Sequence, residues 1–158
     1  MSMATTLPDD LANAIKGRID ELSDALLAVS HSIHARPELA FEEHHAAGLL
    51  SDTLDAQGLA AQRGVFTLET AFEAQLPTRG DGPTVAILAA YDALPGIGHA
   101  CGHNLIATAA LGATLGLQAV APQLPGKVRL IGTPAEEKGG GKELMARAGA
   151  FDGVDAAM

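Results

Sequence analysis

The chain is poor in cysteine, aromatic residues, basic residues and long apolar runs. One cysteine in 158 residues cannot form an internal disulfide, which is typical of a reducing compartment. Only 10 lysines and arginines stand against 19 acidic residues, and the formal net charge of -9 argues against non-specific nucleic-acid binding. No apolar run approaches the roughly 20 residues that span a bilayer, and residues 1–10 lack the pattern of a signal peptide. We therefore expect a cytoplasmic protein that binds neither nucleic acid nor membranes.

The scarcity of aromatic residues also limits how the core can be built. They make up 3% of the chain and include no tryptophan, so Ala, Leu, Val and Ile must supply most of the buried surface. The apolar fraction of 47%, with 18% charged residues, excludes a disordered tail or a coiled coil. A length of 158 residues suits one domain with a sizeable core.

Residues 1–60 are predicted to form a helical segment. Apolar residues recur at helical spacing from Asp9 to Ser30, which predicts one long amphipathic helix. A second helix is predicted over 38–57, closed by Gly58.

Residues 61–158 are predicted to form a hairpin followed by a strand–helix–strand–helix unit. A strand-like stretch at 65–76 and an apolar run at 85–90 flank a turn at 78–83, and the two strands could pair antiparallel. The later elements are a helix at 105–120 with Asn104 as its cap, a strand at 128–131, a helix at 142–148 and the start of a strand at 154–158. This alternation predicts an α/β fold: a three-layer, open, mostly parallel sheet with flanking helices and an antiparallel hairpin.

Side chains capable of metal chemistry follow the predicted strands. They are Asp92, Cys101, His103, Glu136 and Glu137. Ligands of such sheets bind beyond the carboxyl ends of the strands, so these five side chains should meet at one edge. Thiolate, imidazole and carboxylate groups bind zinc and similar metals, and two adjacent carboxylates repel each other unless a cation lies near. The pattern predicts a metal site.

Ordinary structural roles are expected for the remaining candidates. A lone cysteine beside apolar sequence is often only a small buried hydrophobe. His99 lies close to the predicted site, whereas four histidines in the helical segment suggest solvated or structural roles: His31, His34, His44 and His45. The adjacent Glu42 and Glu43 are predicted to lie on an exposed helical face.

Four motifs together resemble a known family. They are HARPEL at 34–39, YDALP at 91–95, GHACGHN at 98–104, and GTPAEE at 132–137 with its continuation to Lys142. The motifs resemble those of the zinc-dependent aminoacylase and carboxypeptidase-like metallopeptidases, within the amidohydrolase branch that includes aminobenzoyl-glutamate hydrolase and related dipeptidases. The resemblance covers residues 31–158.

The resemblance implies a two-metal amide hydrolase. Cys101, His103 and Glu137 would be metal ligands, with the thiolate shared between the ions, and Glu136 would be the general base. Where the wider superfamily has a His-x-Asp motif, this chain keeps only Asp92, which is then expected to orient a ligand. Zinc is the expected metal, with manganese or cobalt as alternatives. The expected substrate is a small amide: an N-acyl amino acid, a dipeptide or an aminobenzoyl-glutamate type compound.

Members of this family are longer than 158 residues, which sets further expectations. They carry a lid or dimerisation domain and two more ligand histidines that have no counterpart here. Residues 1–158 are therefore expected to be a truncated N-terminal portion of a catalytic domain, with the lid or dimerisation domain absent. We expect little or no hydrolase activity from these residues alone, and homo-oligomers formed through uncovered sheet surface.

Three other functions compete with the metal hydrolase. A metal-free scaffold or oligomerisation unit would fit the incomplete ligand set. A cysteine hydrolase could use Cys101 as nucleophile with His99 or His103 as base, but it leaves the paired glutamates unexplained. A phosphate site at 139–141 would lack the Gly-x-x-x-x-Gly-Lys-Ser/Thr pattern and would lie beside two repelling carboxylates.

Overall fold

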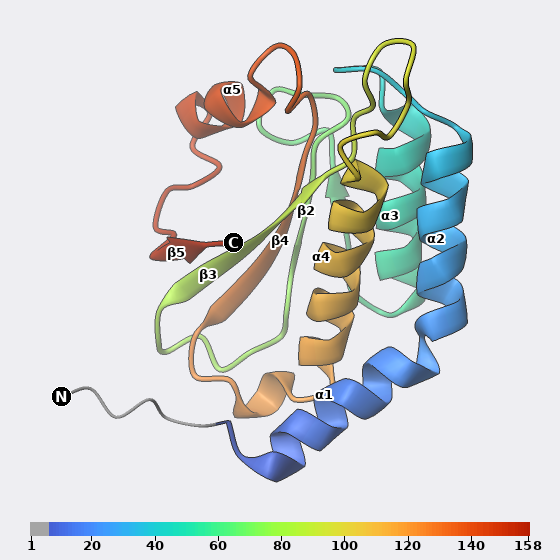
Figure 1. Ribbon diagram of the computed structural model, residues 1–158. Helices are drawn as coiled ribbons and strands as arrows, with labels where there is room; N and C mark the ends of the chain where they lie inside the picture. Colours follow the sequence, from blue (N-terminus) through green and yellow to red (C-terminus); the bar gives the residue numbers. More distant parts are fainter. Residues whose placement is uncertain (1–6) are drawn as a thin grey trace, which may run out of the picture.

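A five-stranded sheet with helices on both faces forms the centre of the chain (Figure 1). The computed structural model describes residues 7–158; residues 1–6, which bear on the expectation about a signal peptide, lie outside the described part. The helices are α1 (Asp9–Glu21), α2 (Ser23–Ala35), α3 (His44–Ala56), α4 (His103–Gln118) and α5 (Gly141–Arg147). The strands are β1 (Gln62–Arg63), β2 (Phe72–Gln75), β3 (Thr84–Ala90), β4 (Lys127–Thr133) and β5 (Ala156–Ala157).

The sheet has the order β1-β2-β4-β3-β5. Strand β3 is parallel to both β4 and β5, whereas β1 and β2 form an antiparallel edge beside β4. Helices α3 and α4 pack against one face of the sheet, with α1 and α2 lying against α4 on the same side, and α5 covers the other face, which gives three layers (Figure 1). The predicted α/β class, the alternation of β3, α4, β4 and α5, and the late strand are confirmed.

The predicted hairpin is wrong. The strands on either side of the turn at 78–83 do not pair, because β4 lies between them and Phe72 of β2 pairs with Gly132 of β4. A Cβ atom on Gly132 would lie 2.2 Å from the Phe72 ring, so the absent side chain lets the ring pack onto the strand. The predicted strand is also too long, since Phe66 and Thr67 have positive φ angles and only Phe72–Gln75 is extended.

The first helix is shorter than predicted because the chain bends at Leu22, which is buried in the core. Helix α2 runs along α4, while α1 turns across the end of α4 (Figure 1). Two glycines of α4 allow this close packing. Leu26 would lie 3.2 Å from a Cβ on Gly112, and Ile19 would lie 3.1 Å from one on Gly116.

Two predicted helix starts also differ. Helix α3 begins at His44 rather than 38, and the Glu38 carboxylate instead accepts hydrogen bonds from the amides of His45 and Ala46 at 2.9 and 3.0 Å. Asn104 does not cap α4, because the left-handed Gly102 occupies that position. The Asn104 amide donates a hydrogen bond to the Ser30 hydroxyl at 3.0 Å and so ties α4 to α2.

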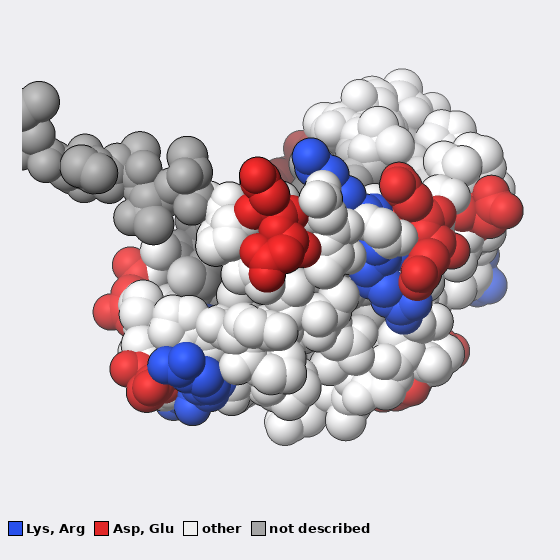
Figure 2. Space-filling model, turned by 90° about the horizontal axis from the view of Figure 1, so that it is seen from below, with Lys and Arg blue, Asp and Glu red and all other residues white. Residues whose placement is uncertain are grey.

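The surface seen from below carries acidic and basic side chains side by side, without a continuous basic stripe on that face (Figure 2). Among residues 7–158, no helix combines the length and the apolar character needed to cross a membrane.

Candidate metal centre

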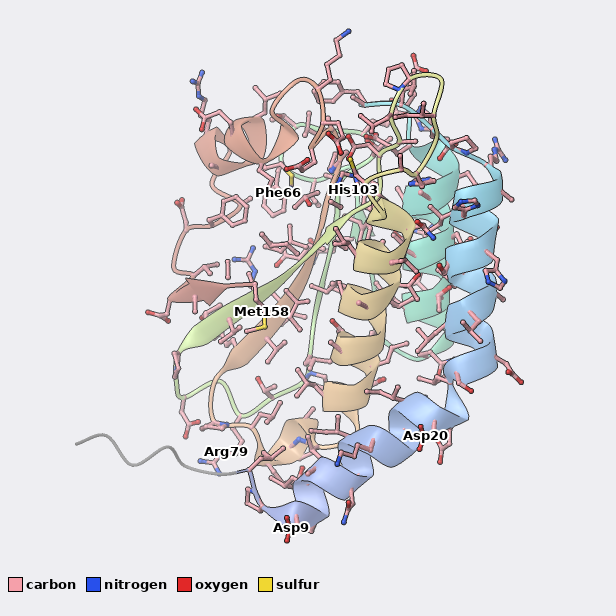
Figure 3. All side chains as sticks on the ribbon, viewed as in Figure 1. Asp9, Asp20, Phe66, Arg79, His103 and Met158 are labelled. Carbon is pink, nitrogen blue, oxygen red and sulfur yellow. The ribbon has the colours of Figure 1, made fainter. Side chains whose placement is uncertain are left out.

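The predicted site lies at the carboxyl ends of β3 and β4. Asp92 follows β3, His103 begins α4, and Glu136 and Glu137 follow β4. Figure 3 shows His103 at the end of the molecule opposite Asp9, where both loops converge above the sheet. The parallel pairing of β3 with β4 places the two loops beside each other although they are far apart in sequence.

Asp92 fixes the orientation of His103. The Nδ1 atom of His103 lies 2.8 Å from the Asp92 backbone oxygen and 3.1 Å from Oδ1 of its carboxylate. Because the carbonyl can only accept, we infer that Nδ1 carries a proton, which leaves Nε2 as the ring nitrogen that could bind a metal. Asp92 also accepts a hydrogen bond from the Glu137 backbone amide at 2.9 Å. It therefore contacts both loops, as expected of a residue that orients ligands.

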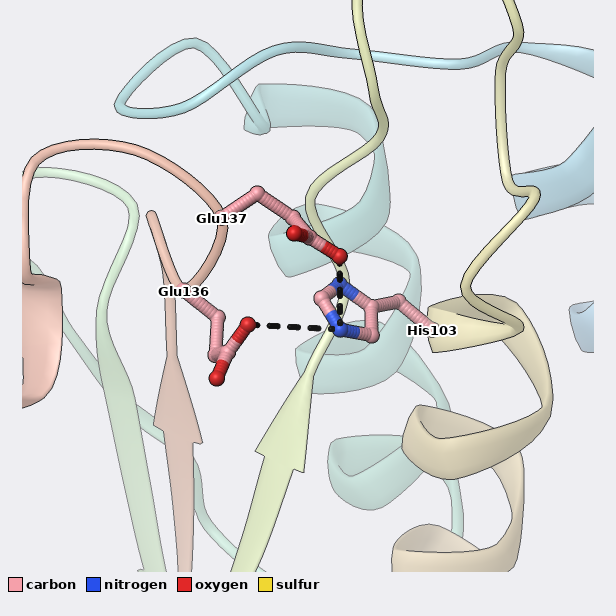
Figure 4. Close-up of side chains that lie close together, drawn as sticks. All are labelled: His103, Glu136 and Glu137. Carbon is pink, nitrogen blue, oxygen red and sulfur yellow. Dashed lines mark ion pairs between the residues drawn. The ribbon is translucent and has the colours of Figure 1, made fainter.

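The Nε2 atom of His103 faces the two glutamates. Nε2 lies 3.8 Å from Oε2 of Glu136 and 3.6 Å from Oε1 of Glu137 (Figure 4). One ligand atom from each of the three residues lies within 4.8 Å of the others. His103 is only 5% exposed, so its approach to the glutamates is held by surrounding structure.

These donors fit a divalent transition metal. A neutral imidazole nitrogen and two carboxylates are ligands that zinc, manganese and cobalt accept. In addition, Oδ1 of Asp92 is buried and, apart from its 3.1 Å contact with Nδ1 of His103, has no polar partner among residues 7–158. A cation at this point would offset the negative charges of Asp92, Glu136 and Glu137, whose mutual repulsion is otherwise unfavourable.

Cys101 lies at the exposed side of this cluster and is not one of its three members. Its pKa is raised chiefly by a hydrogen bond to Glu137, then by desolvation and by the neighbouring carboxylate charges of Glu137, Glu136 and Asp92. The thiol therefore lies beside a candidate metal ligand, and its protonated form is favoured in the absence of metal. The role of Cys101 as a metal ligand stays a prediction.

We predict that Cys101 in metal-free protein reacts slowly with iodoacetamide for an exposed thiol, because little thiolate is present. Replacing Glu137 by Gln should speed the reaction several-fold, since the neighbouring negative charge is removed. Glu143→Gln, which changes an exposed residue on α5, is the matched control. Mass spectrometry over time at pH 8 measures the rate of alkylation. Equal rates in wild type and Glu137→Gln would show that Glu137 does not raise the pKa of Cys101.

His99 is placed near the site but outside the three-residue cluster. Its ring is buried, neither ring nitrogen has a hydrogen-bond partner among the described residues, and it lies beside His34 with ring centroids 6.3 Å apart. Desolvation by burial lowers the pKa of His99, followed by the charges of His34 and His103. His31, His34 and His44 are exposed, and His45 hydrogen-bonds Ser32 at 2.9 Å.

The prediction for Glu43 is wrong. Glu42 is exposed, but Glu43 is 0% exposed and contacts the loop that carries the site glutamates. The error follows from the helix start: because α3 begins at His44, Glu42 and Glu43 precede the helix, and helical periodicity does not decide which of the two side chains is buried. No local sequence signal distinguishes the two neighbours.

A cavity of about 470 Å³ adjoins Glu137. Its walls are largely apolar and come from the loops before α3 and after β3: Leu39, Phe41, Ala93, Leu94 and Pro95. Lys138 and Gly139 complete the wall on the side of the site.

Comparison with known proteins finds similar sequences in one family. The model of peptidase family M20/M25/M40 matches residues 85–158. The Xaa-Arg dipeptidase of Mus musculus is 48% identical over 150 residues, which cover 87% of this chain and 35% of that protein. A p-aminobenzoyl-glutamate hydrolase subunit of Escherichia coli (strain K12) is 36% identical over 170 residues, covering 95% of this chain and 33% of that protein.

Solved structures agree with the sequence matches. The YXEP protein of Bacillus subtilis, described as a dinuclear metal binding peptidase of the M20 family, has a TM-score of 0.81 and 30% identity. The match covers 87% of this chain and 42% of that one. The chain thus spans about a third of the length of the curated relatives it matches. These matches confirm the predicted resemblance to the M20 peptidases and the mixed α/β fold.

Proposed function

We propose, from the chain's relationship to the M20 peptidases, that it holds metal ligands and the general base of a metal-dependent amide hydrolase. The observation that carries this proposal is the convergence of the His103 imidazole on Glu136 and Glu137, with the other ring nitrogen held by Asp92. A buried histidine so oriented is what a metal site requires.

His103 and Glu137 would bind the metal, with Cys101 beside them. A bound divalent metal would polarise the substrate carbonyl and lower the pKa of a coordinated water. Zinc is the proposed metal because thiolate and imidazole donors favour it, and manganese or cobalt are the alternatives. A second ion would complete the two-metal site of the whole enzyme.

Glu136 suits the role of base better than Glu137. The side chain of Glu136 is 45% exposed, whereas that of Glu137 is 22% exposed and its backbone amide is held by Asp92. Glu136 is thus the more accessible carboxylate, able to accept a proton from the attacking water and pass it to the leaving amine.

The proposed substrate is a small amide that releases an amino acid. The relatives include a dipeptidase, an aminobenzoyl-glutamate hydrolase subunit and an N-acetyl-L-cysteine deacetylase. The apolar cavity beside Glu137 is large enough for an apolar side chain or an aromatic acyl group next to the scissile bond. We place the reaction in the cytoplasm and expect the protein to form homo-oligomers.

Hydrolysis assays on the native, full-length protein test this proposal. N-acetyl amino acids, dipeptides and p-aminobenzoyl-glutamate are supplied with zinc, manganese or cobalt, and amino-acid release is measured. We expect one metal to restore turnover and a chelator to abolish it. Activity that survives the chelator but is lost on alkylation would favour a cysteine hydrolase. Protein that neither binds metal nor turns over substrate would favour the scaffold role.

A further inference from the structure

We propose that Glu43 is a positioning residue for the metal centre, a buried carboxylate that fixes the loop carrying Glu136 and Glu137. The metal-related part of this inference rests on the proposed function. The hydrogen bonds on which it is built do not.

Glu43 joins three segments that are distant in sequence. Its Oε1 atom accepts a hydrogen bond from the backbone amide of Ala135 at 2.8 Å, and its Oε2 atom accepts one from the Thr70 hydroxyl at 2.9 Å. The residue immediately precedes α3 and is fully buried. One carboxylate therefore holds the start of α3, the segment before β2 and the loop after β4 together.

The amide that Glu43 accepts belongs to the residue just before Glu136. Ala135 is buried and has a φ angle of 58°, a left-handed conformation that residues other than glycine seldom adopt. Such a conformation persists only where the surroundings hold it. The Glu43 carboxylate accepts a hydrogen bond from the Ala135 amide, and the Ala135 carbonyl accepts one from the Gly141 amide at 3.0 Å. The direction in which the chain enters Glu136 is thereby fixed.

The other oxygen of Glu43 leads to the loop after β3. The backbone oxygen of Thr70 accepts a hydrogen bond from the Tyr91 hydroxyl at 2.6 Å, and the buried Tyr91 directly precedes Asp92. Asp92 in turn accepts the Glu137 amide. These hydrogen bonds form a continuous network through both loops of the site. Glu43 connects the loop after β4, through Ala135, to the loop after β3, through Thr70 and Tyr91.

Stability alone does not explain a carboxylate at this position. Within residues 7–158, Glu43 has no ion-pair partner, and burying an unpaired carboxylate is unfavourable compared with a well-packed apolar side chain. Burial raises the pKa of Glu43, an effect partly offset by hydrogen bonds from backbone amides and from Thr70. What the carboxylate offers is two acceptor atoms for two fixed donors, which no apolar residue can supply.

Cobalt titration of three variants tests the positioning role. Glu43→Ala should weaken Co²⁺ binding by about 10–100-fold, the usual cost of losing a residue that supports a metal ligand, and should shift the visible absorption of the bound cobalt. Glu43→Gln should remain close to wild type, because its amide oxygen can accept from Ala135 while its amide group donates to Thr70. Glu42→Ala, which changes the exposed neighbour, is the control. Folded Glu43→Ala with wild-type affinity and spectrum would overturn the inference.

Amide hydrogen exchange in metal-free protein provides a readout that needs neither metal nor activity. The Ala135 amide should exchange faster in Glu43→Ala and stay protected in Glu43→Gln, while amides in the middle of α3 remain unchanged. Unaltered exchange at Ala135 would overturn the inference. If wild type binds no cobalt, the proposed function fails while exchange still decides the role of Glu43. If Glu43→Ala does not fold, Thr70→Val replaces it: faster exchange at Ala135 supports the inference and unchanged exchange overturns it.

Discussion

Replacing Glu136 by glutamine is expected to lower kcat by about 10²–10⁴-fold and to leave metal binding almost unchanged. The substitution keeps the size of the side chain and its capacity to accept a hydrogen bond, but removes its ability to take up a proton. Glu136 is the more exposed of the two site glutamates. The backbone before it is held by the hydrogen bond from the Ala135 amide to Glu43, which does not involve the Glu136 side chain.

Kinetics and elemental analysis of the same preparation measure both parts of this prediction. Glu143→Gln, on the exposed side of α5, is the matched control and should behave as wild type. A Glu136→Gln variant with full metal content and wild-type kcat would show that another group serves as the base. Loss of metal together with activity would instead assign Glu136 to the ligand set.

Replacing His103 by alanine should have the largest effect on metal affinity. Its Nε2 atom is the imidazole donor at the centre of the described cluster, and its ring is held by Asp92. Asp92→Asn, which changes only a supporting residue, should weaken binding by about 10–100-fold, and His103→Ala should weaken it further. Equilibrium dialysis against zinc measures both values.

His31→Ala is the control for this series, since His31 is an exposed histidine of α2. Circular dichroism shows whether each variant is folded, which matters because His103 is buried and its removal leaves the Asp92 carboxylate with one contact fewer. Equal zinc affinity in His103→Ala and His31→Ala would contradict the assignment of His103 as a ligand.

The parts of this molecule that sequence predicts well are those that depend on local pattern. The apolar runs of β3 and β4 and the loops behind them could be located directly, and parallel pairing brings loops at the same strand ends together. That rule is sufficient to predict that Asp92, His103 and the two glutamates meet. The position of Cys101 outside the three-residue cluster depends on the loop conformation around Gly102, which spacing does not define.

Features that depend on contacts between distant residues could not be predicted. The break at Leu22 follows from packing of α1 and α2 against glycines of α4, and the place of β4 beside β2 follows from the fit of Phe72 onto Gly132. Glu43 is the most consequential case. Its burial depends on a helix start set by a carboxylate five residues earlier in the chain, Glu38, and on a donor 92 residues later, Ala135.

A crystal structure of the zinc-loaded protein, with anomalous data collected at the zinc edge, tests whether His103 and Glu137 bind the metal. We expect an anomalous peak about 2.0–2.2 Å from Nε2 of His103 and from a carboxylate oxygen of Glu137. Zinc bound elsewhere, with the His103 imidazole free of metal in fully loaded protein, would contradict it.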